Sequence, residues 1–130
     1  MNIQRVAQIF GIVFLLVGIL GFITSGGNME ADPAMADKLL GLFPINAVHN
    51  GVHLAFGIWG LLAARSFEGA RNYAMIAGVI YAVLAVLGFV APDGFQLVPL
   101  GGNDIWLHAV LAIALLLAGF SAKRTTTAAV

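Results

Sequence analysis

The sequence predicts an all-α membrane protein: a four-helix bundle built from two parallel two-helix repeats. Composition is the first observation, since hydrophobic residues make up 61% of the chain and charged residues only 9%, against about 25% charged residues in soluble domains. The second is that the apolar residues gather in four runs long enough for membrane helices. The third is that both halves place polar residues at matching positions. We expect one integral membrane domain over residues 1–130.

The four apolar runs predict four membrane spans. Each would be a helix, because lipid cannot satisfy the hydrogen bonds of an open backbone. A helix of about 20 residues rises about 30 Å, which matches the hydrocarbon core of a bilayer. The first run is longer than the core of a signal peptide, which has about 7–15 residues. The predicted spans cover about residues 4–24, 45–65, 71–91 and 104–121.

The first long loop contains the signals of a short helix. Asp32 is a typical N-cap residue, Pro33 suits the first helical position, and Gly41 suits the end of a helix. We therefore expect a short interfacial helix over about residues 33–40. In the second long loop, Pro92-Asp93-Gly94 predicts a turn.

Positive charges predict the orientation in the membrane. Five of the six fall on one side of the spans, namely Arg5, Arg65, Arg71, Lys123 and Arg124, and only Lys38 falls on the other. The positive-inside rule then places both termini in the cytoplasm. We expect a multi-pass protein of the bacterial inner (plasma) membrane. The partners would be the lipid bilayer and other membrane subunits or a second copy of the chain. A net charge of +0 gives no electrostatic basis for binding nucleic acid.

A polar pattern recurs inside the apolar runs, and it contains all three histidines. Its members are Pro44, His49 and His53 in the first half and Pro99, Asp104 and His108 in the second, with equal spacing. Outside it, Gly11 and Phe14 align with Gly78 and Tyr81. Two-helix repeats are related by an axis along the membrane normal. This symmetry predicts that His53 faces His108, and that His49 faces Asp104.

These residue types are metal ligands. His49 and His53 lie four residues apart, so they share one face of a helix, and Asp104 and His108 repeat that spacing. Together, the four side chains would suit zinc, iron or copper. Alternatively, His53 and His108 could be the axial ligands of a haem or another pigment. Ionisable residues inside a membrane are costly, which by default suggests a function.

Structural roles are the alternative for the same residues. Asn46 and Asn103 could cap helices, and Asp104 would be favoured at a helix N-terminus without any ligand. The histidines could hydrogen-bond across helices, for example to Asn50. Asn46, Asn50 and Asn103 thus form a predicted polar cluster around the histidines.

Small residues at helical spacing predict close helix packing, which we interpret as packing inside the bundle, with an interface between two copies of the chain as the alternative. They are Gly11, Gly18, Gly57, Gly60, Ala74, Gly78 and Ala82.

Several of these motifs together resemble a known family. They are residues 42–46 with the two histidines that follow, residues 99–108, and the segment Gly11 to Gly18. On these residues the chain resembles the uncharacterised bacterial membrane proteins grouped as domain-of-unknown-function family 4383. The resemblance covers about Val6 to Gly119. It implies a four-span topology and no particular activity.

For function, the sequence favours a non-enzymatic accessory or scaffolding subunit of a membrane complex. The absence of cysteine removes thiolate chemistry, and no phosphate-binding loop is present. The main alternative is a protein that binds a transition metal, a haem or another pigment through the histidines. A third hypothesis is a membrane protein that handles small molecules or protons through an outward-facing polar pocket.

Overall fold

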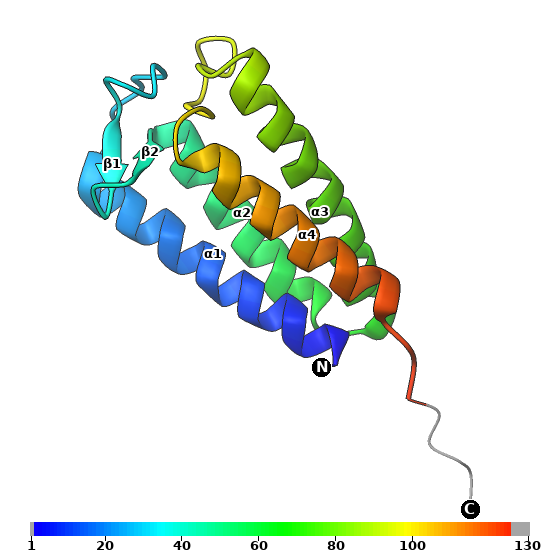
Figure 1. The fold of residues 1–130 in the computed structure, drawn as a ribbon. Helices are drawn as coiled ribbons and strands as arrows, with labels where there is room; N and C mark the ends of the chain where they lie inside the picture. Colours follow the sequence, from blue (N-terminus) through cyan, green and yellow to red (C-terminus); the bar gives the residue numbers. More distant parts are fainter. Residues whose placement is uncertain (1, 126–130) are drawn as a thin grey trace, which may run out of the picture.

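The computed structural model describes residues 2–125. Over this range it contains four helices, α1 (Ile3–Ser25), α2 (Ala47–Ala63), α3 (Phe67–Val90) and α4 (Asp104–Ser121), and a small antiparallel sheet of β1 (Asp37–Leu39) and β2 (Phe43–Ile45) (Figure 1). The all-α prediction is confirmed. Residue 1 and residues 126–130 of the predicted domain lie outside the described range.

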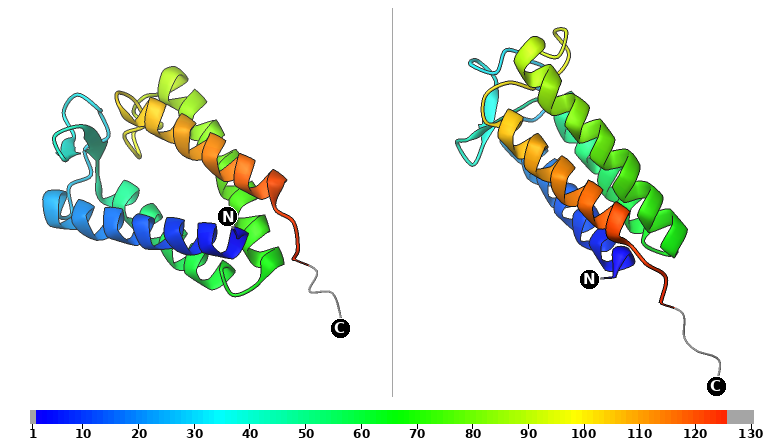
Figure 2. Two further views of the ribbon diagram at one scale, coloured as in Figure 1. Left: turned by 60° about the horizontal axis from the view of Figure 1, so that its bottom comes forward. Right: turned by 45° about the vertical axis from the view of Figure 1, so that its right-hand side comes forward.

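The helices form two hairpins that pack together. α1 packs along α2, and α3 packs along α4, while contacts of α3 with α1 and α2 join the two pairs (Figure 2). α1 and α4 touch only lightly. The β-hairpin and the loop between α3 and α4 lie at one end of the bundle, and α1 begins and α4 ends at the other. Both halves are helix hairpins, as expected, but a symmetry axis that relates them stays a prediction.

Within residues 2–125, three helices are long and apolar enough to cross a membrane: α1, α3 and α4, with 23, 24 and 18 residues. Their 18-residue windows have mean hydropathies of 2.6, 2.3 and 1.9. α2 is apolar but has only 17 residues, which gives a rise of about 26 Å. It is shorter than the predicted span of residues 45–65 because Ile45 belongs to β2 and Asn46 caps the helix.

The predicted interfacial helix over residues 33–40 is wrong, because this segment leads into the β-hairpin. The capping signal is real but local: the Asp32 side chain accepts a hydrogen bond from the Ala34 N–H, and its carbonyl accepts from Met35 and Ala36. Lys38, in β1, then donates to the carbonyl of Pro33.

The chain reverses within the hairpin through a tight turn. Leu40 and Gly41 both have positive φ angles, 56° and 70°, and Leu39 pairs with Phe43 across the turn. Gly41 therefore marks a strand reversal rather than the end of a helix. In the second long loop, the predicted turn is confirmed, since the Gly94 N–H donates to the Ala91 carbonyl.

Glycines allow the helices of each hairpin to approach closely. A Cβ atom at Gly57 would lie 2.7 Å from the backbone nitrogen of Leu15, and one at Gly11 would lie 2.8 Å from that of Leu61. Gly78 is similarly close to Leu116, on α4. The interpretation of these small residues as packing inside the bundle is confirmed at these positions.

Aromatic side chains join the two hairpins. The rings of Phe14 on α1 and Tyr81 on α3 stack with centroids 5.5 Å apart. The Tyr73 hydroxyl of α3 donates a hydrogen bond of 3.1 Å to the Phe56 carbonyl on α2. These contacts set how the half that contains His49 faces the half that contains Asp104.

We expect Gly57→Ala to destabilise the protein, because the new methyl group meets the backbone of α1. Overpacking typically lowers the free energy of unfolding by about 1–3 kcal/mol. Replacing glycine by alanine inside a helix raises it by only up to about 1 kcal/mol. Thermal unfolding in detergent should show a lower midpoint. The control is Gly51→Ala in the same helix, where nothing lies within 4 Å of the new methyl group. An equal midpoint for the two variants would contradict the packing account.

Candidate functional site

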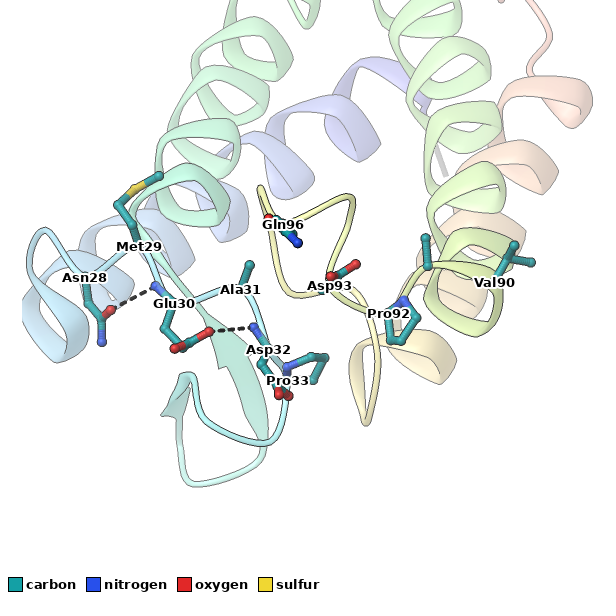
Figure 3. Close-up of a pocket in the computed structure, with 11 residues that line it drawn as sticks. Asn28, Met29, Glu30, Ala31, Asp32, Pro33, Val90, Pro92, Asp93 and Gln96 are labelled. Carbon is teal, nitrogen blue, oxygen red and sulfur yellow. Dashed lines mark hydrogen bonds between the residues drawn. The ribbon is translucent and has the colours of Figure 1, made fainter.

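A large cavity lies away from the histidines. It has a volume of about 980 Å³ and lies between the two long loops, as Figure 3 shows. Its residues are Asn28–Pro33, Val90–Asp93 and Gln96. The polar groups there stabilise local turns: Asn28 accepts a hydrogen bond from the Glu30 N–H, and Glu30 accepts from the Asp32 N–H. Because these groups already have partners and are exposed, the cavity indicates no particular ligand.

A cluster of ionisable side chains is buried between α2 and α4. His49, Asp104 and His108 are 7%, 0% and 2% exposed, and each offers one ligand atom within 4.8 Å of the others. His49 Nε2 lies 3.8 Å from Asp104 Oδ2. The sequence prediction that His49 faces Asp104 is confirmed. We call these three residues the His–Asp cluster.

The starts of two helices position the cluster. The Asn46 side chain accepts a hydrogen bond of 2.9 Å from the His49 N–H, which fixes the first turn of α2. Asp104 is the first residue of α4, and His108 follows one turn later on the same face. Both helix starts lie at the end of the bundle that carries the β-hairpin.

Polar atoms of the cluster lack hydrogen-bond partners. Among residues 2–125, neither carboxylate oxygen of Asp104 has one, nor does Nδ1 of His108 or of the neighbouring His53. Burying a carboxylate without hydrogen bonds or an opposite charge is costly. Such groups are rare in native proteins and call for an explanation, such as a bound ion. The cluster therefore offers buried acceptor atoms that nothing in the described chain uses.

A chain of polar contacts orients His49. Its Nδ1 lies 3.5 Å from Asn50 Oδ1, and Asn50 donates a hydrogen bond of 2.9 Å to the Ser25 hydroxyl of α1. With the proton of the ring on Nδ1, Nε2 presents its lone pair toward Asp104. Gly21 makes room for this arrangement, since a Cβ atom there would lie 2.0 Å from Asn50 Oδ1.

His53 lies beside the cluster rather than in it. Its ring is 4.4 Å from that of His49 and 5.3 Å from that of Phe14, but the set of converging ligand atoms does not include it. Sequence reasoning gave no role to Phe14 or Tyr81, although Tyr81 packs 5.3 Å from His108. The sequence alignment of the two halves could have indicated such a role, because it places Phe14 and Tyr81 at matching positions.

The three predicted asparagines have different roles. Asn46 and Asn50 are fully buried, and Asn46 also donates to the Leu97 carbonyl, which ties the second long loop to α2. Asn103 occupies the N-cap position of α4, but its side chain makes no capping bond. It instead donates to the Leu42 carbonyl and accepts from Trp106. The predicted capping by Asn103 is therefore wrong.

We expect Asn46→Ala to lower the unfolding temperature and Asn103→Ala to change it little. The first variant loses a helix cap, worth about 1 kcal/mol, and leaves the Leu97 carbonyl without its donor. The Asn103 variant loses only hydrogen bonds that are exposed to solvent. Thermal unfolding followed by circular dichroism compares them, and a larger loss for the Asn103 variant would contradict these roles.

Comparison with known proteins places the chain in a family. The family model described as "Domain of unknown function (DUF4383)" matches residues 4–121. No curated protein and no solved structure matched the chain. The match covers the four helices except Ile3, together with the His–Asp cluster, in agreement with the resemblance found in the polar motifs. The chain belongs to the DUF4383 family.

Proposed function

We propose that this protein binds one divalent transition-metal ion between α2 and α4, held by His49, Asp104 and His108. The observation that supports the proposal is the convergence of three buried ligand atoms within 4.8 Å, with both Asp104 oxygens unpartnered. An ion would give the carboxylate the opposite charge that it otherwise lacks. Charge compensation and ligand geometry thus favour the same occupant.

Zinc fits the donor set. Zinc binds imidazole nitrogen and carboxylate oxygen at about 2.0–2.2 Å, which separates tetrahedral ligands by about 3.4 Å. The 3.8 Å between His49 and Asp104 is close to that value, and small side-chain rotations would close the rest. Three protein ligands leave a fourth position open, as in zinc sites that bind water or substrate. The contact from Asn50 to His49 would be the outer-shell bond that such ligands usually have.

A bare ion fits better than a haem or another pigment held by His53 and His108. The cavity that both histidines line has a volume of only about 80 Å³. A cavity of about 150 Å³ holds a single benzene ring, so a macrocycle would require the helices to separate. The small cavity supports the ion and not the macrocycle.

We place the protein in the bacterial inner membrane with four spans and cytoplasmic termini. Five positive residues lie at or near the ends of helices on the side where α1 begins and α4 ends, namely Arg5, Arg65, Arg71, Lys123 and Arg124. Lys38 lies in the β-hairpin at the opposite end. The positive-inside rule supports this orientation, and the His–Asp cluster would then lie in the outer half of the membrane.

Reporter fusions test this orientation. Alkaline phosphatase is active only outside the cytoplasm, so we expect high activity when it is fused after Gly94 and low activity when it is fused after Ser66. A green fluorescent protein fused to residue 125 should fluoresce, because it folds in the cytoplasm. The reverse pattern would contradict the orientation. High phosphatase activity in both fusions would contradict the four-span topology.

A role as an accessory or scaffolding subunit is the second candidate. The exposed apolar faces of the helices, for example at Ile23, Phe89 and Leu117, suit either lipid or a partner helix. The glycines that could have made a partner interface are used inside the bundle, which weakens this candidate. A metal-free, well-folded protein that migrates in a larger complex would favour it over ion binding.

We expect stoichiometric metal in protein purified from its native membrane in mild detergent, measured by elemental analysis. His49→Ala, Asp104→Asn and His108→Ala should each remove most of it, because a three-ligand site loses a third of its donors. The matched control is His53→Ala, which removes a neighbouring imidazole outside the converging set and should keep the ion.

Two results would contradict the metal site. The first is wild-type protein that is folded, metal-free and unable to take up added Zn²⁺ or Co²⁺. The second is a His53→Ala variant that loses metal as fully as the other three, which would mean that the converging set is not the site. Circular dichroism of each variant separates loss of the ion from loss of the fold.

A further inference from the structure

A polar pocket lies between α1 and α2, at the end of the bundle opposite the β-hairpin (Figure 1). Its volume is about 230 Å³. Two arginines, two glutamines and two apolar residues line it: Arg5, Arg65, Gln4, Gln8, Leu61 and Ala64. Because Arg5, Gln8 and Arg65 are exposed, a ligand can reach their polar groups from outside the bundle.

The two arginines come from different helices that are held together at this point. Arg5 lies in the first turn of α1, and Arg65 directly follows the C-cap residue of α2, Ala64. Gln4 Nε2 donates a hydrogen bond of 3.1 Å to the Ala64 carbonyl, which ties the start of α1 to the end of α2. The glycine contacts between the same two helices keep them from separating.

The positive charge of the pocket has no partner in the described part of the chain. Among residues 2–125, the acidic side chain at this end of the bundle is Glu68, and it pairs with Arg124. Arg5 and Arg65 form no ion pair with these residues. Two guanidinium groups that line one pocket repel each other, so an anion between them would be stabilised by both.

The positive-inside rule accounts for the number of basic residues at this end, but not for a glutamine beside them. Gln8 follows Arg5 by three residues, and its exposed side chain lies on a helix surface that continues with apolar residues. The amide of Gln4 bonds to the Ala64 carbonyl, whereas no residue among 2–125 occupies the amide of Gln8. Because a polar group that faces lipid is costly without a hydrogen bond, Gln8 indicates a polar ligand at this depth.

Apolar side chains continue both helix faces from the pocket toward the middle of the bundle. Ile12 follows Gln8 by four residues, and Ile58 precedes Leu61 by three, so each shares a helix face with a pocket residue. Ile12 and Ile58 are 45% and 55% exposed. A molecule that fits both parts is negatively charged at one end and apolar beyond it, which is the chemistry of a phospholipid.

We propose that this pocket binds an anionic phospholipid, with the phosphate group between Arg5 and Arg65. Guanidinium groups bind phosphate through paired, charge-assisted hydrogen bonds, and basic pockets between membrane helices are typical sites for anionic headgroups. The Gln8 amide bonds to the glycerol part of the lipid, and the acyl chains lie along Ile12 and Ile58. No carboxylate lines the pocket, so the cation of a choline headgroup finds no partner there.

The volume agrees with this occupant. A cavity of about 150 Å³ holds a benzene ring, so 230 Å³ has room for a phosphate group and the adjoining glycerol. The inference goes beyond the proposed ion, because it uses no residue of the His–Asp cluster. It requires that the bundle crosses a membrane, but not a particular orientation, since both membrane surfaces carry phospholipid.

Native mass spectrometry of delipidated protein in detergent tests the proposal. The probes are phosphatidylglycerol and phosphatidylcholine with identical acyl chains, and the first phosphatidylglycerol should bind more tightly. Arg5→Gln and Arg65→Gln should each weaken its binding by about fivefold and leave phosphatidylcholine unchanged. The matched control is Lys123→Gln, which removes the same charge from an exposed side chain outside the pocket and should change binding by less than about twofold.

Two further measurements report the site rather than the charge. Gln8→Leu leaves the net charge unaltered and should still weaken the binding of phosphatidylglycerol. In nanodiscs, a phosphatidylglycerol with a diazirine near the start of one acyl chain should label residues 8–12 of α1 and 58–61 of α2. Unlabelled phosphatidylglycerol should suppress this labelling more strongly than phosphatidylcholine does.

Equal binding of the two lipids would overturn the proposal, as would equal weakening by Lys123→Gln and the two arginine variants. Binding of inorganic phosphate without a preference between the lipids would also overturn it and would assign the pocket to a free anion. Circular dichroism checks the fold of each variant, and Gln8→Leu remains informative if an arginine variant fails to fold. Lipid preference in a protein that takes up no metal would reject only the metal site, and zinc uptake without lipid preference would reject only the lipid site.

Discussion

The arrangement of this protein depends on one buried carboxylate. Asp104 is fully buried at the start of α4, faces His49 at 3.8 Å, and has no hydrogen bond to either oxygen. A charged group in an apolar bundle is stabilised only by an opposite charge or by dense hydrogen bonding. The helix N-terminus contributes some favourable potential, and the two imidazoles beside the carboxylate complete the donor set of the cation that we propose.

The rest of the fold holds this cluster in place. Gly57 brings α2 against α1, and Gly21 makes room for the Asn50 side chain that orients His49. The stack of Phe14 on Tyr81 holds the first hairpin against the second. Ligands fixed by packing and by outer-shell hydrogen bonds lose little freedom when an ion binds. Close packing by glycine and the geometry of the proposed metal site are thus two aspects of one structure.

Much of this architecture could be predicted from the sequence, because hydrophobic periodicity and length determine membrane helices directly. The repeated polar pattern also predicted that His49 meets Asp104. The β-hairpin could not be predicted, since Asp32 starts a turn in the same way whether or not a helix follows. The exclusion of His53 from the converging set could not be predicted either. Residues four apart share a helix face, but only the tilt between α2 and α4 decides which of them reaches the other helix.

The central claim is that two imidazoles and one carboxylate hold an ion, and X-ray absorption at the zinc edge tests it most directly. The account predicts nitrogen and oxygen neighbours at about 2.0–2.2 Å, with the outer-shell scattering of two imidazole rings and no sulfur. The pattern should fall to one imidazole in the His108→Ala variant if that protein retains any zinc. An ion surrounded by oxygen alone, without imidazole scattering in the wild-type protein, would contradict the account.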